Sequence, residues 1–145
     1  MEEFMRFAIA EAKKTKGPKR FGAVVVKDGA VIAKACTTVY EENDPTKHAE
    51  ILAIGSAAKA LKNKKLDKCV LYSTCEPCMM CTGAILWAKI PEVVYGMSRQ
   101  DYSEHFEHSN HWHKSIEEIA PPELKIVGGV LREDCIKAFV ERTSQ

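Results

Sequence analysis

The chain lacks the long apolar run that a membrane-spanning helix requires. No stretch approaches the roughly 18 apolar residues of a transmembrane segment. The first residues, Met1-Glu2-Glu3, are acidic and do not form the basic and then apolar pattern of a secretory signal peptide. We therefore expect no membrane association and a cytoplasmic location.

A strong charge bias is lacking as well. The formal net charge is +1, with 21 Lys and Arg against 20 Asp and Glu. Such a balance does not predict a polyanionic partner. Five lysines follow one another closely and could form a nucleic-acid face, although a run of this kind is more often a solvated surface. They are Lys59, Lys62, Lys64, Lys65 and Lys68.

Disulfide bonds are not expected, although six cysteines are present. The chain is longer than the small secreted scaffolds that depend on disulfides. Cys36, Cys69 and Cys135 lie within apolar patterns and are predicted to be buried thiols. With 145 residues, 46% of them apolar, the chain can bury a core, and we predict a single domain over residues 1–145.

Hydrophobic periodicity predicts a helix and then a hairpin in the first quarter of the chain. Apolar residues recur at helical spacing over about residues 2–15. Two β-rich runs follow, at 21–26 and 31–36, and they flank the Asp28-Gly29 turn signal. This pattern predicts a β-hairpin.

The rest of the chain alternates helices with short strands, which indicates an α/β fold with parallel pairing after the hairpin. Asp44 and Pro45 predict the N-cap and first residue of a helix that ends near Leu61. Residues 98–122 are predicted to form a loop or short helix that covers the active site. The other expected elements are strands over 70–72, 93–95 and 124–127 and helices over 78–88 and 132–140.

A metal site is predicted where His48 and the run Pro77-Cys78-Met79-Met80-Cys81 come together. If Pro77 opens a helix, the thiols of Cys78 and Cys81 lie on one face of its first turn. A helix N-terminus favours negative charge and lowers thiol pKa values. With His48 as the third ligand, the set suits a zinc ion that keeps one position open for water, as catalytic zinc sites do. A structural zinc site, or buried thiols without a metal, is the alternative.

Glu50 is predicted to transfer protons at this site. It is not needed as a ligand, and a carboxylate beside the metal can take a proton from water and return it to a leaving amine. His48 and Glu50 are two positions apart, about 200° around a helix. They can line one cavity only if the site caps the helix N-terminus. Cys75 precedes the second helix and is not counted as a ligand.

His48-Ala49-Glu50 followed by Pro77-Cys78-Met79-Met80-Cys81 resembles the H-x-E and P-C-x-x-C signature of the zinc-dependent cytidine deaminase-like superfamily. The resemblance covers about residues 21–96. It implies a three-layer α/β/α fold with a mixed five-stranded sheet and helices on both faces. It also implies one Zn²⁺ per chain, release of ammonia from an aminated nucleobase or nucleoside, and a homodimer.

Within the superfamily, Asn43-Asp44-Pro45-Thr46 and Ser73-Thr74-Cys75-Glu76-Pro77-Cys78 are most similar to bacterial guanine deaminases and guanosine deaminases. The tRNA adenosine deaminases share much of this pattern but typically have Leu in place of Cys75. The resemblance therefore implies guanine or guanosine as substrate. A tRNA adenosine, cytosine or a triazine remains as an alternative.

The resemblance also implies where the substrate is contacted. These families usually place an Asn where Thr37 or Thr38 stands here, and a Thr offers a single hydroxyl in place of an amide. Glu107 is a candidate for hydrogen bonds to substrate N–H groups, and Trp112 could stack on a base. The other implied contacts lie within the two motifs, at Ala49, Glu76 and Pro77.

Four histidines fall between residues 105 and 113, at His105, His108, His111 and His113. Their spacing does not match a strong ligand pattern, so we do not expect a second metal site there.

Overall fold

The computed structural model describes residues 1–105 and 114–141. The elements follow in the order α1 (Glu2–Ala12), β1 (Gly22–Lys27), β2 (Ala30–Cys36), α2 (Val39–Glu42), α3 (Ala49–Leu61), β3 (Cys69–Cys75), α4 (Met79–Trp87), β4 (Glu92–Met97), α5 (Arg99–His105), α6 (Ile116–Ile119), β5 (Lys125–Val127) and α7 (Arg132–Val140). Over these residues, no helix is both long enough and apolar enough to cross a membrane.

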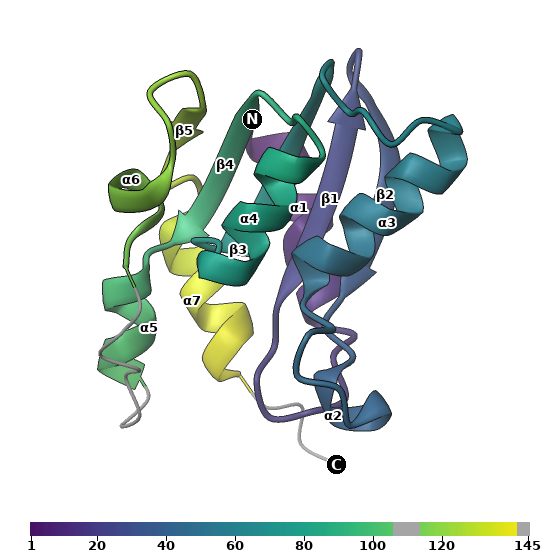
Figure 1. Ribbon diagram of the computed structural model, residues 1–145. Coiled ribbons are helices and arrows are strands. Elements are labelled where there is room, and N and C mark those ends of the chain that lie inside the picture. The colour runs from purple at the N-terminus through teal and green to yellow at the C-terminus, as the bar shows by residue number, and fades with distance from the viewer. Residues whose placement is uncertain (106–113, 142–145) are drawn as a thin grey trace.

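A mixed five-stranded sheet with the strand order β2-β1-β3-β4-β5 forms the middle layer (Figure 1). Strand β1 pairs antiparallel with both β2 and β3, whereas β3, β4 and β5 run parallel to one another. The predicted hairpin is therefore confirmed, and so is parallel pairing in the second half of the chain.

Helices cover both faces of the sheet, and each face has its own core. Helices α3 and α4 lie on the face turned toward the viewer in Figure 1, and α1 and α7 lie behind the sheet. The alternate side chains of β1 point to the two cores, because successive residues of a strand face opposite sides. Ala23 and Val25 join the α3 side, and Val24 and Val26 join the α1 side. The predicted three-layer fold is confirmed.

At two positions in the first half of the chain, the structure explains why the residue is glycine. At the hairpin turn, Asp28 and Gly29 have φ values of 50° and 74°, which suits the turn type that matches the twist of the strands. At the start of β1, a Cβ on Gly22 would lie 2.0 Å from the carbonyl oxygen of Ala8. Helix α1 therefore packs directly on the backbone of β1.

The predicted start of α3 at Asp44 is wrong, and the residue that caps the helix is His48. The carboxylate of Asp44 instead accepts hydrogen bonds from the backbone N–H of Thr46, at 2.9 Å, and from its hydroxyl, at 2.6 Å. Asp forms such local turns as readily as it caps helices. The short helix α2, which the sequence pattern did not predict, precedes this turn.

The predicted helix boundary at Pro77 is wrong in the same way. Cys78 is the N-cap of α4, so Pro77 lies just before the helix and not at its first position. Helix α1 is also shorter than predicted and ends at Ala12, after which Lys14 and Thr15 form tight turns. The closing helix α7 has the predicted bounds.

An ion pair links α5, next to the site, to α7 on the back of the sheet. Arg132 donates to both carboxylate oxygens of Asp101, at 2.6 and 3.0 Å. Asp101 also accepts from the backbone N–H of Ser98 at 2.9 Å. The hydrogen bonds from Arg132 lower the pKa of Asp101 to about 2.

Replacing Asp101 by Asn removes this ion pair and is expected to lower the free energy of unfolding at pH 7 by about 1–2 kcal/mol. The loss is modest because solvent partly screens the half-exposed Arg132. The pKa is lower in the folded chain than the unfolded value of about 3.9. The stabilisation is therefore complete above that value and is lost as the pH falls toward 2. Urea unfolding of both proteins between pH 2 and 7 tests this. A difference that stays constant down to pH 2 would contradict it.

Candidate active site

His48, Cys78 and Cys81 come together at the point where α3 and α4 begin. His48 caps α3, Cys78 caps α4, and Cys81 lies in the first turn of α4. Their ligand atoms all lie within 4.8 Å of one another. Among the described residues, this is the one group of side chains placed to bind a metal ion together. The predicted grouping of the three residues is present, and Cys75 is not a member of the group.

The spacing of these atoms fits a tetrahedral zinc ion. His48 Nδ1 lies 3.5 Å from the Sγ of Cys78 and 3.5 Å from the Sγ of Cys81. Zn–S distances of about 2.3 Å and Zn–N distances of about 2.0 Å at tetrahedral angles would separate N and S by about 3.5 Å. Two thiols and one imidazole are also the donor types that zinc prefers.

The surroundings favour a thiolate at this cluster. Hydrogen bonding with Cys81, assisted by His48, lowers the pKa of the Cys78 thiol to about 3. The same hydrogen bond and burial raise the pKa of the Cys81 thiol. Hydrogen bonding with Cys78 raises the pKa of His48. The N-termini of α3 and α4 add positive potential at the same point.

Glu50 lies beside the cluster in the first turn of α3. Its side chain is 5% exposed, and burial raises its pKa. Because His48 is the N-cap and Glu50 is the second helical residue, both face the space in front of the helix end. The site therefore caps the helix, which is the arrangement that the two-residue spacing required.

A cavity of about 570 Å³ opens in front of the cluster. This volume is in the range of small-molecule sites. His48, Glu50 and Cys78 form part of its wall. The other lining residues come from the segment before β1, from α2 and the loops on either side of it, from the end of β3, from the start of α4 and from α5. They are Thr15, Gly17, Pro18, Lys19, Phe21, Thr37, Val39, Tyr40, Pro45, Cys75, Glu76, Met80, Arg99 and Tyr102.

The predicted substrate contacts separate into two groups. Thr37 and Glu76 line the cavity, whereas Thr38, Ala49 and Pro77 are absent from its described lining. The hydroxyl of Thr37 donates to the carbonyl oxygen of Lys47 at 3.0 Å, and the hydroxyl of Thr38 bonds to Glu42, away from the cavity.

Three predictions fall wholly or partly outside the described residues. The roles of Glu107 and Trp112 belong to residues 106–113, as do most of the histidines between residues 105 and 113. The predicted covering segment is described only at its two ends, as the short helices α5 and α6.

Glu76 connects the two ends of that segment to the site. Its carboxylate accepts the backbone N–H of Arg99 at 3.3 Å and that of Ile116 at 3.1 Å. Glu76 is 4% exposed, and burial raises its pKa. This carboxylate therefore holds the first residues of α5 and α6 against the end of β3.

Sequence reasoning missed Arg99 and Tyr102. Both lie on α5 and line the cavity, and the Arg99 guanidinium lies 4.8 Å from the centre of the Tyr102 ring. The position of Arg99 could have indicated its role, because ligands in α/β folds bind beyond the carboxyl ends of parallel strands. Arg99 follows the end of β4 by two residues.

Comparison with known proteins places this geometry in a family. The model of the cytidine and deoxycytidylate deaminase zinc-binding region matches residues 1–97. A guanine deaminase of Bacillus subtilis is 52% identical over 84 residues, and a tRNA-specific adenosine deaminase of Aquifex aeolicus is 45% identical over 96 residues. These matches cover 58% and 65% of this chain and 54% and 64% of the two relatives, less than two thirds of each.

Solved structures agree with the fold. The structure of a guanine deaminase from Bacillus subtilis is 46% identical, with a TM-score of 0.68, over 72% of this chain and 68% of that one. A structure from work on A-to-I editing by tRNA:A34 deaminases is 30% identical, with a TM-score of 0.78, over 95% of this chain and 99% of that one. His48, Cys78 and Cys81 lie within the matched zinc-binding region, and they are the group of side chains that could hold its metal ion. The chain belongs to the cytidine and deoxycytidylate deaminase zinc-binding family.

Proposed function

We propose that this protein is a hydrolytic deaminase that replaces the amino group of a nucleobase or nucleoside by oxygen and releases ammonia. The observation that carries the proposal is that Glu50 and two of the proposed zinc ligands, His48 and Cys78, line one cavity of about 570 Å³. A closed structural zinc site would have four protein ligands and no such cavity.

Glu50 is the group that moves the protons. Zinc held by His48, Cys78 and Cys81 supplies Lewis-acid activation of water. The buried Glu50 carboxylate takes one proton from the attacking water and delivers it to the ring nitrogen, and it then transfers the second proton of that water to the leaving amine. The balance is one water consumed and one ammonia released for each amino group replaced by a carbonyl oxygen.

Guanine or guanosine is our proposed substrate. Cys75, which distinguishes the guanine deaminase pattern from the usual Leu of tRNA adenosine deaminases, lines the cavity. The guanine deaminase relative also has the higher percentage identity over its matched length, 52% against 45%.

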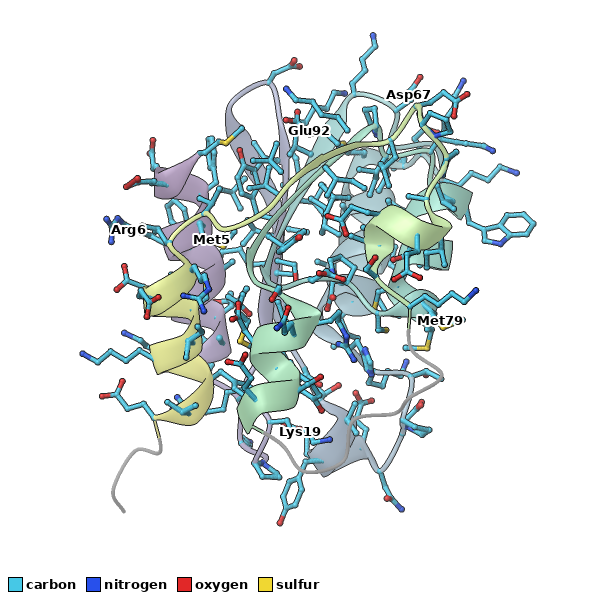
Figure 2. The ribbon with its side chains drawn as sticks, turned by 90° about the vertical axis from the view of Figure 1, so that its left-hand side faces the viewer. Met5, Arg6, Lys19, Asp67, Met79 and Glu92 are labelled. Carbon is cyan, nitrogen blue, oxygen red and sulfur yellow. The ribbon has the colours of Figure 1, made fainter. Side chains whose placement is uncertain are left out.

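A tRNA-specific adenosine deaminase is the second candidate, supported by the fold likeness over nearly the whole chain to the tRNA:A34 structure. The lysines at 59–68 give this candidate little support. They surround the end of α3, whose 13 residues separate them from the site by about 20 Å. In Figure 2, Asp67 within this region lies far from Met79 at the start of α4. Deamination of cytosine or a triazine is a further alternative.

Ammonia release by zinc-loaded protein tests the proposal. The panel contains guanine, guanosine, adenine, cytosine, cytidine, a triazine and a tRNA anticodon stem. Activity on guanine or guanosine supports the proposed substrate. Activity confined to the RNA would overturn it in favour of tRNA editing, and activity confined to cytosine or the triazine would assign another heterocycle.

We further propose that a second copy of the chain covers α4. This helix carries no charged residue, and Trp87 is 86% exposed, with Met79 and Met80 each 37% exposed. Exposed apolar side chains gathered on one helix are typical of an interface. Met80 also lines the cavity, so a second copy on this face would reach its rim.

Replacing Trp87 by Lys is expected to convert a dimer to a monomer, because the new charge would be buried at the interface without a partner. Light scattering after gel filtration measures the mass. Val140 is also exposed but lies on α7, on the other face of the sheet, so Val140→Lys is the matched control. Equal masses for both variants and the wild type would contradict this use of the α4 face.

All six cysteines are free thiols. Free thiols are typical of a reducing compartment, which supports a cytoplasmic location. Both cores pack against the same sheet, which supports the interpretation of residues 1–145 as one domain.

A further inference from the structure

Arg99 brings a positive charge into the cavity close to the reacting groups. It lines the same cavity as His48, Glu50 and Cys78. A ligand that fills this cavity can therefore contact both Arg99 and the groups proposed to carry out the chemistry.

The backbone of Arg99 is held by contacts on two sides. Its N–H donates to the buried Glu76 carboxylate at 3.3 Å. The hydroxyl of Ser98 accepts from the N–H of Asp101 at 3.1 Å, and the Asp101 carboxylate accepts from the N–H of Ser98, which closes the first turn of α5. Asp101 is itself anchored to Arg132. Such support is what a side chain needs in order to recognise a ligand with defined geometry.

The side chain of Arg99 is oriented as well. Its guanidinium lies over the ring of Tyr102, with 4.8 Å between the guanidinium carbon and the ring centre. Among residues 1–105 and 114–141, no carboxylate lies within ion-pair distance of it. The five N–H donors of a guanidinium form a planar fork that suits two adjacent acceptors.

We propose that Arg99 recognises the O6 and N7 edge of a 6-oxopurine whose C2 amino group faces Glu50 and the zinc ligands. This inference rests on the proposed deaminase function and names how the site selects its substrate. Residue Arg99 is then a specificity-determining residue that contacts the substrate.

The shape of guanine allows it to contact the reacting groups and Arg99 at the same time. When C2 is presented to the reacting groups, O6 and N7 lie side by side on the far edge of the ring system. These are two adjacent acceptors, the pair that an Arg fork binds in a bidentate manner. Adenine presented through C6 turns a different edge to Arg99, with no oxygen on it. Cytosine is a single ring and lacks this second edge.

The test compares guanine with 7-deazaguanine, in which a C–H replaces the N7 acceptor, for the wild type, Arg99→Met and Arg99→Lys. We expect Arg99→Met to lower kcat/KM for guanine by about 10- to 100-fold, mainly through KM. Wild type is expected to discriminate against 7-deazaguanine by about 10-fold, and Arg99→Met to lose that discrimination. Arg99→Lys keeps the charge but not the fork and should recover only part of the loss.

Arg6→Met is the control, since Arg6 is exposed on α1 and lies far from Met79 in Figure 2. Calorimetric binding of both purines to each zinc-loaded variant gives a readout apart from turnover. Equal loss for guanine and 7-deazaguanine in Arg99→Met would overturn the proposal. A wild type that releases no ammonia from guanine or guanosine overturns the proposed function itself. An active wild type with an unchanged Arg99→Met overturns only the role of Arg99.

Discussion

Replacing Glu50 by Gln is expected to lower kcat by about 10²- to 10⁴-fold while the protein still binds one zinc ion per chain. Glu50 is the buried carboxylate that faces the cavity in the first turn of α3, and it is not among the three metal ligands. Gln keeps the size of the side chain but can neither accept nor return a proton at neutral pH. The loss should therefore appear in turnover and not in metal content.

The measurements are steady-state ammonia release and zinc content by elemental analysis on the same samples. Glu11 offers a matched control, because it is also largely buried but lies on α1, on the other side of the sheet. Glu11→Gln should retain full turnover. If Glu50→Gln kept wild-type kcat with zinc bound, the carboxylate would not be the proton carrier, and a non-catalytic zinc module would become the better interpretation.

Replacing Cys78 by Ala is expected to remove zinc from the purified protein and to lower activity by at least about 10³-fold, since Lewis-acid activation of water contributes several kcal/mol. Two ligands, His48 and Cys81, would remain, fewer than the three of a catalytic zinc site. The unfolding temperature should fall as well. A metal that binds only the folded chain stabilises it, and this contribution disappears with the site.

Cys36 provides the control for this substitution. It is a free thiol at the end of β2 and is not part of the metal cluster. Cys36→Ser should keep one zinc per chain, and a chelator should lower its unfolding temperature as much as that of wild type. The same chelator should leave Cys78→Ala unchanged. Full zinc content in Cys78→Ala would show that another donor completes the site.

The sequence by itself predicted the grouping of His48 with Cys78 and Cys81, the neighbouring Glu50 carboxylate, and the hairpin followed by parallel strands. Zinc accepts few donor types, and two of the three donors, Cys78 and Cys81, lie within one helical turn. Strand and helix periodicities follow from local backbone geometry, so the hairpin at Asp28-Gly29 and the alternation after it could be predicted without knowledge of distant contacts.

The tertiary structure decided the helix starts and the wall of the cavity. His48 and Cys78 cap their helices because both helix ends converge at the end of β3, whereas Asp44 satisfies its carboxylate within a local turn. The two backbone N–H groups that Glu76 accepts come from residues 23 and 40 positions later in the chain. Arg99 enters the cavity only because β4 lies beside β3 in the sheet. Contacts of this kind depend on the order of strands in the sheet, which a local pattern of residue types does not predict.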